Sequence, residues 1–197
     1  MKYSPALQEV ADTIYNTLKI YTPVEVKDYG WGNYKWTSNI FSWAHLETFC
    51  TPKISVLHSV IMPHKHSSAP IFGFDVIEIN GELTAMFLDL TPVDHRVFPL
   101  PEIGEPRKEL PEWAEIFSPS FINCKPSVDD VKVGINVLNA YLFEFLPGTT
   151  KKDYSKKQQA YIDGQRKNTT TLKTLKSLVG EETANEFFTE VLFPDIV

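Results

Sequence analysis

Residues 54–90 read ISVLHSVIMPHKHSSAPIFGFDVIEINGELTAMFLDL, and this stretch decides the fold. It contains apolar runs at 54–62, 71–79 and 83–90, each of the length of a β-strand. The Asn80-Gly81 dipeptide between the last two runs is typical of a two-residue β-hairpin turn. Short connections of this kind join antiparallel strands, because a parallel crossover needs a much longer connection. The stretch therefore predicts the centre of an antiparallel sheet.

The flanking sequence extends this sheet and adds helices on either side of it. Residues 34–50 read as extended chain that ends at the turn 51–53, and residues 116–124 are expected to form a further strand. Consecutive strands followed by helices indicate an α+β fold, with one central antiparallel sheet and helices packed on its faces. A single domain is expected over residues 1–197. Helices are expected over residues 5–19 after an N-cap at Ser4, over 127–145 with a capping box of Ser127 and Asp130, and from 154 onward, the last covering 181–192.

The composition is that of a globular protein with an uneven charge distribution. Hydrophobic residues make up 43% of the chain, which is enough to bury a core and excludes a disordered or collagen-like chain. The net charge is −6, yet residues 150–176 hold eight Lys and Arg against two Asp. Such a basic segment is either a solvated helix face or a docking surface for an anionic ligand, an acidic protein or nucleic acid.

The cysteines and the hydropathy indicate a reducing compartment. Cys50 and Cys124 lie far apart and lack the spacing of a disulfide framework or a Cys-built zinc site. The N-terminal segment is polar and lacks the apolar core of a signal peptide, and no apolar run has the length of a membrane span. We therefore expect a cytoplasmic protein with no membrane partner. The motifs of nucleotide and flavin sites are also absent from the sequence.

Four ionisable residues stand inside the apolar strands. His45 and Glu47 are two residues apart and therefore share a strand face. If residue 62 pairs with residue 71, His58 lies directly opposite Asp75. If the strands on either side of the 51–53 turn pair in register, Glu47 lies opposite His58. Glu47, His58 and Asp75 would then form a row across three neighbouring strands, here called the ionisable row, with His45 beside it.

This row admits several interpretations. Burying four titratable groups on one sheet face is costly unless they serve a ligand, although a satisfied buried hydrogen-bond network is the structural alternative. A metal site built from the row is less favoured, since the compact ligand motifs of such sites are missing, and we expect no metal. Proton donors without a redox group of their own predict protonation chemistry on a bound substrate, with electrons supplied from outside.

The sequence resembles the ferredoxin-dependent bilin reductases, and within them the phycocyanobilin-type branch and its compact members carried by phages. The matching segments are short, but they follow in order from about residue 41 to the C-terminus. They include 45–47 (HLE), 57–63 (LHSVIMP), 71–75 (IFGFD), 88–92 (LDLTP), 116–118 (IFS), 125–126 (KP), 165–168 (QRKN), 180–181 (GE) and 190–193 (EVLF).

The resemblance implies a three-layer α/β/α sandwich with biliverdin IXα bound between the sheet and the C-terminal helices. It implies four-electron reduction of the bilin to a phycobilin by single electrons from ferredoxin, with radical intermediates that take protons from the protein. No tightly bound cofactor is implied. The short chain is similar to the phage-carried members, which are associated with phycoerythrobilin, so phycoerythrobilin is favoured slightly over phycocyanobilin as the product.

The resemblance also implies roles for individual residues. Asp75 looks like the carboxyl group that contacts the pyrrole nitrogens and protonates the bilin, His58 like its proton-relay partner, and Glu47 like the acid near the D-ring with His45 as its neighbour. Asn168 matches a position over the substrate. Thr84 and Lys125 match positions that hold the propionates. Two departures affect this last assignment, because Lys125 stands where Arg is usual and Thr170 stands where a basic residue is expected.

Two other functions remain open from the sequence, a non-catalytic tetrapyrrole carrier and a metal-dependent hydrolase. Retention of the ionisable row argues against a carrier, and the missing ligand motif argues against a hydrolase. Biliverdin and ferredoxin are both anionic, so the basic segment is expected to serve them rather than nucleic acid. A monomer is expected.

Overall fold

The computed structural model describes residues 3–106, 112–146 and 148–196, and within them the chain forms one sheet with helices on both faces. The eight described strands are all antiparallel, in the order β1-β2-β3-β4-β5-β6-β8-β7. Only the last two strands depart from the order of the sequence. The strands are β1 (Thr22–Val24), β2 (Gly32–Thr37), β3 (Phe41–Cys50), β4 (Ile54–Pro63), β5 (Ile71–Ile79), β6 (Glu82–Thr91), β7 (Glu105–Pro106) and β8 (Ile122–Lys125).

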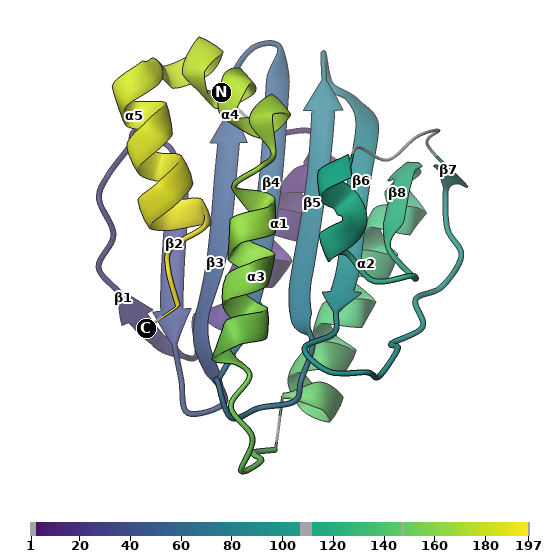
Figure 1. Ribbon diagram of the computed structural model, residues 1–197. Helices are drawn as coiled ribbons and strands as arrows, with labels where there is room; N and C mark the ends of the chain where they lie inside the picture. Colours follow the sequence, from purple (N-terminus) through teal and green to yellow (C-terminus); the bar gives the residue numbers. More distant parts are fainter. Residues whose placement is uncertain (1–2, 107–111, 147, 197) are drawn as a thin grey trace.

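The helices form a layer on each face of the sheet (Figure 1). Helices α1 (Pro5–Leu18) and α2 (Val128–Ala140) cover one face, and α2 continues into the π-helical turn η2 (Tyr141–Phe145). The other face carries α3 (Ser155–Gln165), α4 (Thr169–Val179) and α5 (Glu181–Glu186), followed by the π-helical turn η3 (Phe187–Leu192). Each layer buries its own hydrophobic cluster against the sheet. The expected α/β/α sandwich is confirmed.

Local sequence signals explain where two of the helices begin. The Ser4 hydroxyl accepts a hydrogen bond from the backbone N–H of Leu7, and Pro5 occupies the first turn of α1. At α2 the side chains of Ser127 and Asp130 cap each other's backbone N–H groups, which is the predicted capping box. Both helices then turn apolar residues toward the sheet, including Leu7, Ile14, Val131 and Leu138.

The expected strand over residues 116–124 is wrong for most of its length. A short 3-10 helix, η1 (Glu112–Ile116), precedes a turn, and only residues 122–125 join the sheet. The reason lies at Ser118 and Pro119. The buried carboxyl of Asp89 accepts hydrogen bonds from both the backbone N–H and the hydroxyl of Ser118. Pro119 has no N–H to donate. These residues therefore cannot form a strand ladder, and they fold over the sheet as a wall.

The helices within the described residues include none long and apolar enough to cross a membrane.

Candidate functional site

The ionisable row lies across the centre of the sheet. The β3–β4 register pairs Glu47 with His58, and the β4–β5 register pairs His58 with Asp75. Both predicted registers are therefore confirmed, and the three side chains emerge from adjacent strands on the face covered by α3 and α4. The chain achieves this because short turns hold β3, β4, β5 and β6 as consecutive neighbours.

His58 and Asp75 form the central contact of the row. The Nδ1 atom of His58 and the Oδ1 atom of Asp75 are hydrogen-bonded, and the side chains are 12% and 34% exposed. Burial lowers the pKa of His58, but the charge of Asp75, this hydrogen bond and the charge of Glu47 together outweigh burial and raise the pKa. Within the described part of the chain the Nε2 atom of His58 is buried without a partner, so the end of the ring opposite Asp75 is available to a ligand.

Glu47 is the most deeply buried acid of the row, with 4% of its surface exposed. Burial raises the pKa of its carboxyl to about 7; the charge of Asp75 adds to this, and the charge of His58 opposes it. A carboxyl with this pKa is partly protonated at neutral pH. It can therefore donate a proton and take another from solvent under ordinary conditions.

His45 stands beside the row and supports it. Its ring is fully buried, and its Nε2 atom lies 2.7 Å from the Oδ1 atom of Asn33 on β2. Burial, and then the charges of His58 and Lys35, lower the pKa of His45, so the ring is neutral and its Nε2–H donates to the Asn33 oxygen. Its ring centroid lies 5.8 Å from that of His58. His45 does not line the cavity described next, so it contacts the row rather than a ligand.

A cavity of about 500 Å³ opens above the row, between the sheet and helices α3 and α4. This is the size range of sites for drug-sized and cofactor-sized ligands. Aromatic side chains form one wall: Phe117 stacks on Phe121 with ring centroids 4.0 Å apart, and Phe121 stacks on Phe87 at 6.2 Å. The charged groups on its described lining are Glu47, Asp75, Asp89 and the imidazole of His58, with no Lys or Arg among them.

The expected substrate-binding residues divide between the cavity and its surroundings. Asn168 lines the cavity and is also the N-cap of α4, where its Oδ1 atom accepts the N–H of Thr171 at 3.1 Å. Thr170 lines the cavity as well. Thr84 lies at a bulge of β6 and donates its hydroxyl to the carbonyl of Ile77 at 3.0 Å, outside the lining. Lys125 is exposed at the end of β8 and also lies outside it.

Sequence reasoning missed several polar residues of the cavity, among them Asp89, Tyr161 and Gln165. Asp89 is 2% exposed. Its carboxyl accepts hydrogen bonds from the backbone N–H and the hydroxyl of Ser118 and from the hydroxyl of Thr91. Burial raises the pKa of Asp89, while the hydrogen bonds from Ser118 and Thr91 oppose this rise. An acid inside an apolar strand was the signal that identified Asp75, and the same signal was present at Asp89. Tyr161 and Gln165 on α3 had no such signal, because only the packing of the helix brings them to the sheet.

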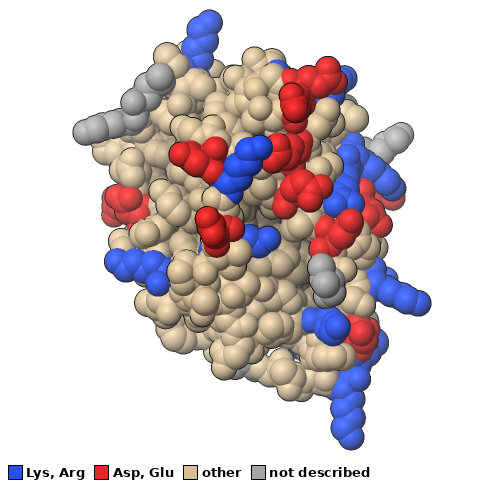
Figure 2. All heavy atoms as spheres, turned by 90° about the vertical axis from the view of Figure 1, so that its left-hand side faces the viewer, with Lys and Arg blue, Asp and Glu red and all other residues tan. Residues whose placement is uncertain are grey.

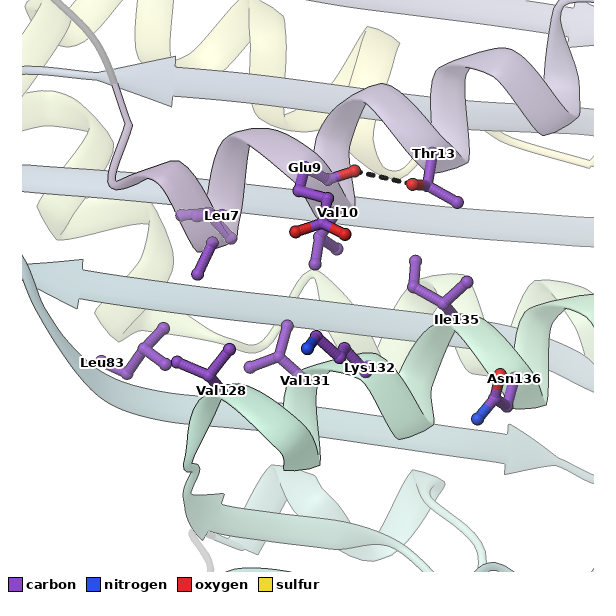
Figure 3. Close-up of a pocket in the computed structure, with 11 residues that line it drawn as sticks. Leu7, Glu9, Val10, Thr13, Leu83, Val128, Val131, Lys132, Ile135 and Asn136 are labelled. Atoms are coloured by element: carbon purple, nitrogen blue, oxygen red, sulfur yellow. Dashed lines mark hydrogen bonds between the residues drawn. The ribbon is translucent and has the colours of Figure 1, made fainter.

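A second cavity lies on the opposite face of the sheet, between α1 and α2 (Figure 3). It measures about 240 Å³, and its wall is formed mainly by aliphatic side chains such as Leu7, Val10, Val131 and Ile135. Its charged residues are Glu9 and Lys132, and none of the predicted site residues reaches it. The larger cavity is therefore the candidate active site. Among the described residues, no group of three or more His, Cys, Asp and Glu side chains is placed to hold a metal ion.

Known proteins resemble this chain in sequence. Residues 24–194 match the family model of ferredoxin-dependent bilin reductases. The phycocyanobilin:ferredoxin oxidoreductase of Trichodesmium erythraeum is 28% identical over 164 residues, which cover 72% of this chain and 66% of that protein. The protein of the same name from Prochlorococcus marinus (strain MIT 9313) is 28% identical over 164 residues, which cover 72% of this chain and 62% of that protein. The chain thus spans less than two thirds of the length of these relatives.

Solved structures share the fold. The structure of PcyX superposes with a TM-score of 0.70 at 21% identity, covering 97% of this chain and 99% of that chain. Phytochromobilin synthase from tomato, solved in complex with biliverdin, superposes with a TM-score of 0.68 at 15% identity, covering 98% of this chain and 83% of that chain. At these identities the likeness establishes the α/β/α architecture.

Proposed function

The chain belongs to the ferredoxin-dependent bilin reductase family, and on that premise we propose that it reduces biliverdin IXα by four electrons to a phycobilin, with ferredoxin as the electron donor. The observation that carries the proposal is the ionisable row Glu47–His58–Asp75 on the floor of an apolar, aromatic-walled cavity of about 500 Å³. A conjugated tetrapyrrole suits the aromatic wall, and its reduction needs a proton for every electron that it accepts.

The row supports proton delivery across the neighbouring strands, from one of its side chains to the next. Asp75 is the most exposed of the three side chains and lies under the cavity, so we assign it the contact with the pyrrole nitrogens. His58 pairs with both residues in the sheet; its Nδ1 atom is bonded to Asp75, and we assign its unpartnered Nε2 atom the exchange of protons with Glu47 through a bridging water. Glu47 titrates near neutral pH and serves as the reserve of protons. Electrons arrive singly from ferredoxin, and a proton from this row follows each one, so that a second electron and proton convert each radical intermediate into a closed-shell product.

We further propose phycoerythrobilin rather than phycocyanobilin as the product. The support is the resemblance of the sequence motifs to the compact phage-associated members of the family. Which double bonds are reduced depends on where the protons are delivered. Chromatography of the reaction product against both bilin standards decides between the two.

The basic segment 150–176 is the proposed docking surface for ferredoxin. Two of its cations are paired within the protein, Arg166 with Asp195 and Lys176 with Glu181. The face that carries β1, β2 and α5 shows acidic and basic side chains interspersed (Figure 2), and includes the ion pair Lys27–Glu186. An acidic partner therefore finds its complement along α3 and α4, the layer that covers the cavity. The exposed cations of this docking surface are Lys151, Lys152, Lys156, Lys157, Lys167 and Lys173.

One reconstitution tests the activity. The protein is incubated with biliverdin IXα, ferredoxin, ferredoxin–NADP⁺ reductase and NADPH, and the absorbance spectrum is followed before chromatography of the pigments. We expect bound biliverdin to be replaced by radical intermediates and then by a phycobilin. A spectrum that stays at bound biliverdin with reduced ferredoxin present would overturn the reductase and favour a bilin carrier.

A further inference from the structure

Tyr161 on α3 places its hydroxyl oxygen over the floor of the cavity. The residue is 4% exposed, and a Cβ atom added to Gly73 on β5 would lie 3.5 Å from this oxygen. Because Gly73 has no side chain, the hydroxyl comes close to the backbone of the sheet. The strand register pairs Gly73 with Asp89, and Asp75 follows two residues later on the same face. The phenol oxygen therefore lies beside two carboxyl groups of the cavity.

A hydrogen bond fixes the orientation of this hydroxyl. The Nε2 atom of Gln165, one turn further along α3, donates to the Tyr161 oxygen at 2.9 Å. This bond uses a lone pair of the oxygen and leaves the hydroxyl proton for another acceptor. Within the described part of the chain, the hydrogen bonds of Tyr161 include no acceptor for that proton. A buried hydroxyl without an acceptor is costly, so the arrangement is suited to a ligand that supplies one.

The environment keeps the proton on the oxygen. Burial raises the pKa of Tyr161, the charges of Asp89 and Asp75 add to this, and the hydrogen bond from Gln165 opposes it. The hydroxyl is therefore a hydrogen-bond donor at all relevant pH values rather than an acid that titrates during turnover. This separates its chemistry from that of Glu47, whose pKa is about 7.

We infer that Tyr161 is a further substrate-contacting residue, whose hydroxyl donates a hydrogen bond to a lactam carbonyl oxygen of the bound bilin while Gln165 holds it in place. The inference rests on the proposed function, since biliverdin is the ligand. A neutral lactam suits this position better than a propionate, because the neighbouring Asp75 and Asp89 would repel a second anion. This contact sets the position of the bilin above Asp75. It therefore also determines which bilin atoms receive protons.

The substitution Tyr161→Phe removes the hydroxyl and keeps the ring. We expect the Kd for biliverdin, measured by absorbance titration, to rise roughly three- to tenfold, as for the loss of one hydrogen bond. We also expect the absorbance maximum of the bound bilin to shift, since a lactam carbonyl belongs to the conjugated system. Gln165→Leu, which leaves the phenol unanchored, should shift the same maximum in the same direction. Tyr141→Phe is the matched control, because the Tyr141 hydroxyl donates to the carbonyl of Pro70 at 2.8 Å on the other face of the sheet.

The outcomes separate this inference from the proposed function. Unchanged affinity and spectrum in Tyr161→Phe would overturn the contact, even if the wild-type protein reduces biliverdin normally. The contact would also be overturned if Tyr141→Phe caused the same spectral shift, since the effect would then follow from lost stability. A wild-type protein that binds biliverdin without reducing it would overturn the reductase while leaving the contact to be decided by the titration. A wild-type protein that does not bind biliverdin would overturn both.

Discussion

His58 and Asp75 are held in hydrogen-bonding contact by the register of two adjacent strands, β4 and β5. Neither side chain depends on a flexible loop for its position, because both belong to the central part of the sheet. The pair links a partly exposed carboxyl in the cavity to an imidazole whose other neighbour is the buried Glu47. A substitution at Asp75 is therefore expected to change the protonation of His58 and Glu47 as well.

Asp75→Asn should retain biliverdin and lose turnover. The amide keeps an oxygen that His58 can contact, but it removes both the transferable proton and the charge that raises the pKa of His58 against the effect of burial. We expect kcat to fall by roughly 100-fold or more, as for the loss of a general acid, with the reaction stalled at a radical or an early intermediate. Single-turnover absorbance spectroscopy measures this. Asp12→Asn, on the exposed surface of α1, is the control and should behave as wild type. Full turnover in Asp75→Asn would remove Asp75 from the mechanism.

The pKa of Glu47 predicts how turnover depends on pH. Because this carboxyl must be protonated to donate, kcat should decline as the pH rises through about 7. Glu47→Gln cannot titrate, so its residual kcat should be low and should lack this decline. Stopped-flow measurements between pH 5.5 and 8.5, a range set about the pKa of 7, provide the profile. An unchanged decline in Glu47→Gln would assign it to another group.

The same pKa makes a prediction about stability. The carboxyl pKa is about 7 in the folded protein against 4.5 for an ordinary glutamate, so between these pH values the folded state holds a proton that the unfolded state releases. The associated stability is fully present below pH 4.5 and is lost as the pH rises through 7. Glu47→Gln should therefore be more stable than wild type by up to roughly 3 kcal/mol above pH 8, and similar to it in acid. Urea denaturation at the two pH values measures the difference. A constant difference across pH would contradict the shift.

The sequence was sufficient to predict the ionisable row for two reasons. Alternate residues of a strand share a face, and short turns between strands allow few pairing registers. The pattern predicts that Glu47, His58 and Asp75 lie in one row, and the strand registers confirm this alignment. Tyr161 could not be found in this way, since its position depends on how α3 packs against Gly73. The predicted strand at 116–124 was wrong over residues 116–121 for a related reason, because the backbone N–H and the hydroxyl of Ser118 are bonded to Asp89, which is distant in sequence.

Ser118→Ala tests whether Asp89 holds the aromatic wall in place. The substitution removes the hydroxyl that donates to a buried carboxyl and leaves the backbone N–H of residue 118, at 3.0 Å, as the remaining bond from this segment. We expect the free energy of unfolding to fall by about 1–3 kcal/mol, and biliverdin to bind more weakly because Phe117 and Phe121 lose their anchor. Thermal unfolding and absorbance titration measure the two effects. Ser177→Ala, on the exposed surface of α4, is the control. Unchanged stability together with unchanged affinity would show that the aromatic wall does not depend on the hydrogen bond between the Ser118 hydroxyl and Asp89.

The basic segment should control the encounter with ferredoxin and leave bilin binding alone. Lys156 and Lys157 are exposed on the first turn of α3, so the double charge reversal Lys156→Glu/Lys157→Glu should raise the KM for ferredoxin several-fold with little change in the Kd for biliverdin. The wild-type rate at limiting ferredoxin should fall as salt is raised from 0.05 to about 0.5 M, because the Debye length shortens over that range. Lys19→Glu, exposed at the end of α1 on the opposite face of the sheet, changes charge without touching the docking surface and should leave both constants unchanged.

If Lys19→Glu raises the KM as much as the double reversal does, net charge rather than a defined surface governs the encounter. If salt and both variants have no effect on the rate, the segment is a solvated helix face and ferredoxin docks elsewhere.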